Sequence, residues 1–194
     1  MYRRRSGLNF GRQKKKVNVP LLKEAAVWTA EILIVMLIAV TMVYFGGMRT
    51  SVVGQSMSET LNNGDEVLVN RFTYILTDPK PNDIIVFLPN GNEKSHYYVK
   101  RVIAVPGDTI LIQNGEVYVN GEPFTEEVDV SAMEDAGLAA EEMTLGNDEY
   151  FVLGDNRNNS EDSRFSDIGN ISKKYIVGKV WFTVSPKNKI GFIK

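Results

Sequence analysis

The strongest pattern along the chain is an apolar run of 21 residues, positions 25–45, that carries a single charge, Glu31. A helix needs about 20 such residues to cross a bilayer. The apolar positions lie all round the helix rather than in one stripe, which disfavours a core helix of a soluble domain. Trp28 and Phe45 lie near its two ends, where aromatic residues meet the membrane interface. The run predicts a single N-terminal transmembrane helix over residues 25–46.

A cleavable signal peptide is a second alternative for this run, because a basic region precedes it. However, the basic region is long, the run exceeds the usual apolar core of a signal peptide, and no clear small-x-small site follows at residues 45–48. We therefore expect an uncleaved anchor.

After residue 65 the pattern changes to short apolar or alternating runs separated by turn residues. The expected strands are 66–70, 83–87, 97–105, 109–112, 116–119, 150–153 and 176–184. Asn114-Gly115 between two of them is a strong hairpin signal. One helix is expected at 132–143, because Ser131 and Glu134 match a capping box. The fold class is therefore mainly β: a compact antiparallel β-sheet domain with one short helix, preceded by the single N-terminal transmembrane helix.

Charge is divided unevenly between the two sides of the expected anchor. Residues 1–24 contain eight Lys and Arg against one Glu, a net charge of +7, and residues 47–194 contain 14 against 22 Asp and Glu, a net charge of −8. The positive-inside rule then places a basic tail, 1–24, in the cytoplasm and the β-rich domain, 47–194, on the outer side of the cell membrane. The basic run 14–16 could bind RNA, but anionic lipid is favoured because the apolar run follows. We expect a lipid bilayer as partner and no nucleic acid.

The chain has no cysteine and one histidine, His96. This excludes thiol nucleophiles, Cys-based zinc sites, disulfides and a three-histidine metal site. A Ser-His-Asp triad would have to use His96, which lies in an expected turn away from the other motifs.

Candidate chemistry begins at 54–61, where Gly54 stands two positions before Ser56. A glycine there lets backbone N–H groups point at a carbonyl oxygen, as an oxyanion hole requires. A Gly-x-Ser loop is common, so this signal alone is weak.

Lys100 is unexpected inside the apolar strand 97–105. If it faces the core, burial would lower its pKa and leave a neutral amine that can take a proton from a serine hydroxyl. Alternatively, it faces solvent and protects an edge strand. Alternation places Tyr98, Lys100 and Val102 on one face and Arg101 on the other, so periodicity does not decide.

The stretch 154–164 is rich in Asp, Asn, Ser and Arg and follows an apolar strand. Such residues build Asx turns and Asp–Arg pairs. A calcium loop is an alternative, but the spacing does not fit an EF-hand.

Together, 54–61, 98–108 and 154–164 behind an N-terminal anchor resemble the bacterial type I signal peptidases, in the smaller form common in Gram-positive bacteria. The resemblance covers residues 51–194 plus the anchor. It implies a membrane-anchored serine endopeptidase that cleaves signal peptides after small residues with a Ser-Lys dyad, without metal or cofactor. The implied partners are signal peptides of secreted preproteins and the secretion translocon.

The resemblance assigns roles to positions of this chain. Ser56 matches the nucleophile, Lys100 the general base and Ser160 the serine that orients the lysine amine. Gly54, with the Ser56 N–H, falls where the oxyanion hole is built. The remaining matches are residues that support the site: Tyr98 beside the lysine, and a salt-bridge network of Arg101, Asp155, Asp162 and Arg164. Plausible pocket lining is Val53, Met57, Ile85, Val86 and Val102.

Glu59 departs from the family pattern, which usually has proline there. Losing the fixed φ of proline would loosen the turn after Ser56. Two rival functions remain: a self-cleaving repressor-type Ser-Lys peptidase, which would need a DNA-binding domain where the anchor lies, and a non-enzymatic, membrane-tethered β domain.

Overall fold

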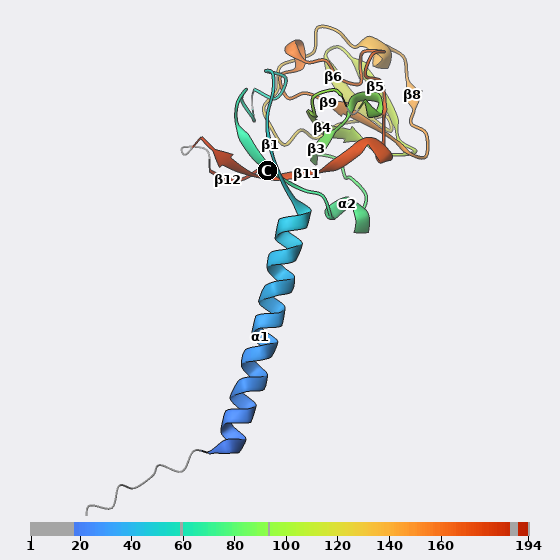
Figure 1. Ribbon diagram of the computed structural model, residues 1–194. Helices are drawn as coiled ribbons and strands as arrows, with labels where there is room; N and C mark the ends of the chain where they lie inside the picture. The colour runs from blue at the N-terminus through green and yellow to red at the C-terminus, as the bar shows by residue number, and fades with distance from the viewer. Residues whose placement is uncertain (1–17, 59, 93, 187–189, 194) are drawn as a thin grey trace, which may run out of the picture. The chain divides into compact units, whose positions relative to one another are not determined.

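The computed structural model describes residues 18–58, 60–92, 94–186 and 190–193. It divides into two compact units, one up to Met42 and one over Val43–Lys194, which are described separately. The expected basic tail, 1–24, lies largely outside the described residues. The mainly β fold class is confirmed, with one long apolar helix before an antiparallel β domain (Figure 1).

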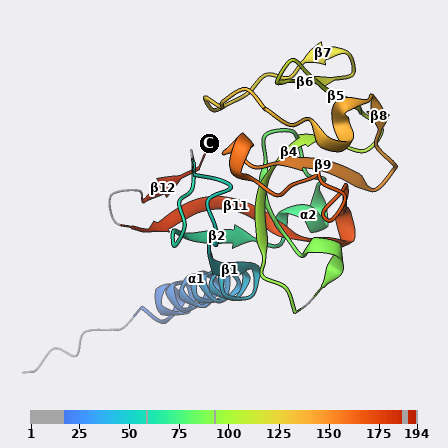
Figure 2. The same ribbon diagram turned by 90° about the horizontal axis from the view of Figure 1, so that it is seen from above.

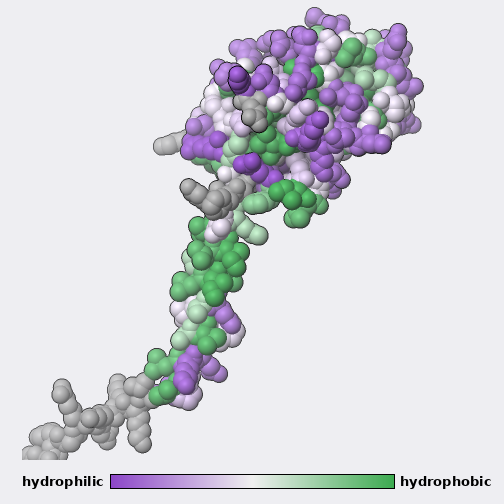
Figure 3. Space-filling view, turned by 45° about the vertical axis from the view of Figure 1, so that its right-hand side comes forward, coloured by the Kyte–Doolittle hydropathy of each residue, from purple (hydrophilic) through white to green (hydrophobic). Residues whose placement is uncertain are grey.

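The N-terminal unit is built on α1, Val19–Gly46, and its stretch Val19–Val43 is long and apolar enough to cross a membrane. Figure 3 shows apolar side chains along its surface. The helix begins six residues before the expected anchor. Pro20 fits this start, because the first helical turn needs no proline N–H.

The β domain contains a large antiparallel sheet in the order β1-β2-β11-β3-β4-β9-β10, with β12 paired to β11. Its strands are β1 (Gly47–Ser51), β2 (Glu66–Asn70), β3 (Ile84–Phe87), β4 (Tyr98–Ala104), β9 (Glu149–Leu153), β10 (Ile171–Ser172), β11 (Ile176–Ser185) and β12 (Gly191–Phe192). β3 and β4 are interior strands, and both faces of each are buried.

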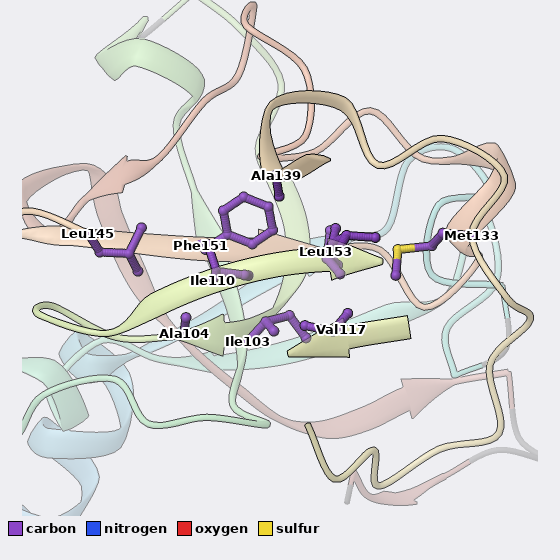
Figure 4. Packing of buried hydrophobic residues seen from close by; sticks show 10 residues of the cluster. Ile103, Ala104, Ile110, Val117, Met133, Ala139, Leu145, Phe151 and Leu153 are labelled. Atoms are coloured by element: carbon purple, nitrogen blue, oxygen red, sulfur yellow. The ribbon is translucent and has the colours of Figure 1, made fainter. Parts of the chain in front are cut away.

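A second antiparallel sheet has the order β7-β6-β5-β8 and lies to one side of the first (Figure 2). Its strands are β5 (Thr109–Gln113), β6 (Glu116–Val119), β7 (Glu122–Pro123) and β8 (Met143–Thr144). The β5–β6 turn is the expected one, since Asn114 and Gly115 both have positive φ, 55° and 81°. Figure 4 shows the apolar cluster that joins side chains of this sheet, such as Ile110, to Phe151 of β9.

The short helices are α2 (Thr73–Leu76) and the 3-10 helices η1 (Pro89–Gly91), η2 (Gly137–Ala140), η3 (Arg157–Asn159) and η4 (Lys173–Tyr175). All the strands expected from sequence are present with ends shifted by at most one residue. The two-residue strands β7, β8, β10 and β12 were not expected, because so short a run has no periodicity. β1 was also not expected.

The helix expected at 132–143 is wrong. Only η2 is helical there, and Met143 begins β8. Gly137 has φ +52°, and its N–H donates to Asp135 Oδ1 instead of to a backbone carbonyl of a helix. The Glu134 N–H donates to Asn158 Oδ1, so a distant loop takes the place of the expected cap. Local side-chain bonds and glycine therefore outcompete the helix.

Phe87→Ala should lower the free energy of unfolding by about 3–5 kcal/mol, because Phe87 is fully buried on an interior strand and packs against Tyr98. Thermal melting of the purified protein in detergent would measure the change. Leu76→Ala removes a side chain that is 86% exposed and serves as the control, with an expected change within about 0.5 kcal/mol. Equal losses in both variants would contradict the assignment of Phe87 to the core.

Candidate active site

Ser56 lies in the loop between β1 and β2, which is closed at its base by backbone bonds. The Val52 N–H donates to Asp65 O at 2.8 Å, and the Gly64 N–H donates to Val52 O at 2.8 Å. Beyond Ser56, Met57 is fully buried and its carbonyl accepts from the Thr60 N–H at 2.8 Å. Glu59 lies outside the described residues, so its effect on this turn stays a prediction.

Gly54 has φ +91°, a left-handed conformation in which a side chain would be strained. Its N–H donates to Asn63 Oδ1 at 3.0 Å. That bond and the left-handed backbone shape the loop just before Ser56. The expected part of Gly54 in an oxyanion hole stays a prediction.

Lys100 lies on interior strand β4, paired with Ile85 of β3, and is 3% exposed. The alternative in which it protects an edge strand is therefore wrong. Its Nζ lies 5.7 Å from the centroid of the Tyr98 ring. Burial lowers the pKa of Lys100 to about 8, and the carboxylates of Asp162 and Glu161 oppose that fall.

Ser160 comes from the loop after β9. Its hydroxyl donates to Asp162 Oδ2 at 2.7 Å, and the same oxygen accepts from the Gly154 N–H at 3.1 Å. This bond fixes the rotamer of Ser160. Because the hydroxyl acts as the donor in it, the lone pairs of Ser160 Oγ can still accept a hydrogen bond from an amine. Asp162 is held in turn by Arg164, whose Nε donates to Asp162 Oδ1 at 2.8 Å.

Gly154 brings the Ser56 and Ser160 loops into contact, a role that sequence reasoning missed. A Cβ at Gly154 would lie 2.2 Å from Ser160 Oγ and 2.4 Å from Ser56 O. The Asn156 N–H also donates to Ser56 O, at 3.0 Å. The only sequence signal was the Gly-Asp-Asn turn at 154–156.

Arg101 and Asp155 form a buried pair whose side chains are both 0% exposed. Arg101 Nε and Nη2 donate to the two carboxylate oxygens at 2.8 and 2.9 Å, and Nη1 donates to Asn82 O at 3.0 Å. The expected salt-bridge network is thus resolved into two forked pairs, Arg101–Asp155 and Arg164–Asp162.

A cleft of about 670 Å³ gathers three stretches of the β domain. It is lined by Val53, Gly54, Gln55, Ser56, His96, Tyr97, Tyr98, Val99, Lys100, Asn158, Asn159, Ser160, Glu161, Phe165, Asp167 and Ile168. Five of the nine expected site residues are in that list. Arg101, Asp155, Asp162 and Arg164 are buried outside it.

Two expectations about the surroundings are wrong. His96 lines the cleft instead of lying away from the other motifs. Of the plausible lining residues only Val53 lines it; Met57, Ile85, Val86 and Val102 are buried in the core. Within the described ranges, no group of three His, Asp or Glu side chains could hold a metal ion.

Comparison with known proteins gives a family and close relatives. A family model described as signal peptidase, peptidase S26, matches residues 25–185. Signal peptidase I P of Bacillus subtilis subsp. natto is 38% identical over 174 residues, which cover 86% of this chain and 92% of that protein. Probable signal peptidase I-1 of a Synechocystis species is 32% identical over 182 residues, covering 91% and 85%. A crystal structure of a signal peptidase I from Enterococcus faecalis V583 gives a TM-score of 0.41 at 27% identity and covers 53% of this chain and 97% of that one.

Asp155→Asn should lower the free energy of unfolding by about 3–5 kcal/mol, because it leaves the Arg101 guanidinium buried without its counter-charge. Thermal melting in detergent would measure the loss. The matched control is Asp78→Asn, which breaks the exposed pair with Lys173 and should cost about 1 kcal/mol or less. A melting temperature unchanged in Asp155→Asn would show that the pair does not support the fold.

Proposed function

Because the chain belongs to the S26 signal peptidase family and is a serine peptidase, we propose that it removes signal peptides with a Ser-Lys dyad made of Ser56 and Lys100. The observation that supports this most is the shared cleft: Ser56 and Lys100 come from distant segments, line the same cavity, and the lysine is buried there. The match to the signal peptidase family supports a peptidase over the non-enzymatic β domain, and a signal peptidase over the repressor-type peptidase.

The proposed reaction begins with proton transfer from Ser56 Oγ to the neutral Lys100 amine, which Ser160 orients. The Ser56 oxygen then attacks the carbonyl carbon of the scissile peptide bond. The Ser56 N–H is the backbone donor that we assign to the developing oxyanion. Lys100 returns its proton to the leaving amine, and water hydrolyses the acyl-enzyme by the same base.

Tyr98 has a supporting part in this mechanism. Its ring lies beside Lys100 Nζ and helps to keep water from the amine. Water exclusion favours the neutral form of a lysine, as the proposed base requires.

We propose cleavage after small residues of the Ala-x-Ala type. The substrate would enter as an extended segment along the cleft wall formed by Val53 and by 96–100, where backbone groups can pair with it. Metal and cofactor have no part in the proposed steps.

The membrane part of the function rests on α1. We propose that it is a single-pass anchor in the cell membrane, with the basic residues 1–24 in the cytoplasm and the β domain outside. Ser56 follows the last helical residue, Gly46, by only ten positions, so the anchor would keep the nucleophile near the bilayer from which signal peptides emerge. Partners under this proposal are signal-peptide-bearing preproteins, lipid and the secretion translocon.

Ser56→Ala and Lys100→Ala should each reduce cleavage of a preprotein in detergent by about 10⁴-fold or more, because each removes a group that acts as a unit with the other. Gel analysis of the processed product would measure this. His96→Ala is the control and should stay within about tenfold of the unchanged protein, although His96 lines the cleft. Retained activity in Lys100→Ala would contradict the proposed dyad, and loss of activity in His96→Ala alone would indicate a histidine base.

A penem-like probe that acylates the unchanged protein and spares Ser56→Ala would identify the nucleophile independently.

The pH dependence of kcat/KM should follow Lys100. Burial lowers the pKa of its amine from 10.5 to about 8, and only the neutral amine accepts a proton. Activity should therefore rise about tenfold per pH unit below pH 8 and level off above it. The initial rate of cleavage at substrate concentrations below KM, measured from pH 6 to 10, tests this. A pH profile whose midpoint is lost in His96→Ala would contradict the assignment of the base.

A further inference from the structure

Glu161 follows Ser160 directly and lines the same cleft as Ser56 and Lys100. Its side chain is exposed, and no hydrogen bond or ion pair to it is present in the part of the chain that the structure describes. The two buried carboxylates beside the site, Asp155 and Asp162, are each neutralised by a forked arginine. Glu161 therefore presents an uncompensated negative charge to whatever occupies the cleft.

The position of Glu161 relative to the reacting groups follows from two observations. Ser160 and the Ser56 carbonyl both lie against Gly154, so the residue after Ser160 is close to the nucleophile loop. The Glu161 carboxylate also acts electrostatically on the Lys100 amine and raises its pKa against the effect of burial. The side chains that flank a scissile bond at Ser56 would thus share one cleft with this charge.

Asp167 lines the same cleft and is exposed as well. Two carboxylates face the cavity. Among the described residues that line it, the basic side chains are Lys100, whose amine the proposed mechanism needs neutral, and His96. The occupied cleft would therefore have a negative potential, which attracts cations.

An extended substrate offers a defined place for a cation. Side chains alternate between two sides of an extended segment. If the small residue before the scissile bond points into the enzyme, the residues immediately before and after it both point to the other side. These two neighbours do not need to be small, so they are free to carry a long basic side chain.

We propose that Glu161 is a specificity-determining residue that favours Lys or Arg at a position flanking the small residue of the cleavage site. This inference rests on the proposed function, since it requires a peptide bond cleaved at Ser56. Glu161 contacts substrate and is not a proton-transfer group. Because it is exposed, its contribution is that of a solvent-accessible ion pair, which corresponds to about a two- to fivefold effect on kcat/KM.

The test compares peptides that differ only at one flanking position. One set carries Lys, Gln or Glu immediately before the small residue, and a second set carries them immediately after it. The full-length protein in detergent should cleave the Lys peptide of at least one set about two- to fivefold better than the Gln peptide, and the Glu peptide worse. The difference should be mainly in KM, because the ion pair forms in substrate and transition state alike. It should shrink in 0.5 M NaCl, where exposed charges are screened.

Glu161→Gln should bring the Lys-to-Gln ratio to about one, and Glu161→Lys should invert it. Ratios between peptides are used because a change at residue 161 also alters the Lys100 amine, and that change affects all peptides equally. Glu141→Gln is the matched control: it removes the same charge from an exposed residue that does not line the cleft, so the ratio of the unchanged protein should be kept.

A Lys-to-Gln ratio near one in both peptide sets, or a preference that persists unchanged in Glu161→Gln, would overturn the inference and leave the dyad standing. Failure of the proposed function has a different signature: cleavage of every peptide would then be absent, or would persist in Ser56→Ala, and the inference would fall with it.

Discussion

The arrangement of the site depends on the buried pair of Arg101 and Asp155. Both side chains are 0% exposed, and they join interior strand β4 to the loop that follows β9. A buried charge is tolerated only when it is paired and hydrogen-bonded. The two carboxylate oxygens and the carbonyl of Asn82 meet this condition for Arg101. The pair therefore fixes where the loop carrying Ser160 can lie relative to β4, and Lys100 stands on that strand one residue before the arginine.

Lys100 and Arg101 are neighbouring basic residues of β4, and both are buried, but the structure accommodates their charges in different ways. The Arg101 guanidinium is met by a forked carboxylate, whereas burial lowers the pKa of the Lys100 amine. The difference is chemical as well as geometric, since a guanidinium keeps its proton under all such conditions and an ammonium does not. Opposite faces of one strand thus provide a permanent cation for structure and a titratable amine for the proposed chemistry. Asp162 is close enough to raise the pKa of that amine, but Arg164 holds its carboxylate and limits the effect.

The sequence was most informative where one pattern is local and repeated. The alternation around Val67 and Val69 was enough for β2, and Asn114-Gly115 was enough for the β5–β6 hairpin. Prediction from the sequence failed where a distant segment takes a backbone hydrogen bond that a local element would need. At 132–143, Asn158 Oδ1 accepts from the Glu134 N–H. Periodicity also could not decide the environment of Lys100, because both faces of β4 are covered. The motifs anticipated that Ser56, Lys100 and Ser160 would meet, but His96 joins their cleft only through the pairing of β3 with β4, which turn residues alone do not reveal.

Because position 154 has room only for glycine, it limits which residues of the cleft can be substituted. Ser56 O and Ser160 Oγ both lie too close to Gly154 to leave room for a Cβ, so any side chain at that position would push the two loops apart. Diversification of substrate range must then proceed elsewhere, through exposed lining residues such as Tyr97, Asn158 and Phe165. Engineering follows the same division: a library that spares position 154 and randomises the exposed wall would sample new selectivity without disturbing the contact between the Ser56 and Ser160 loops.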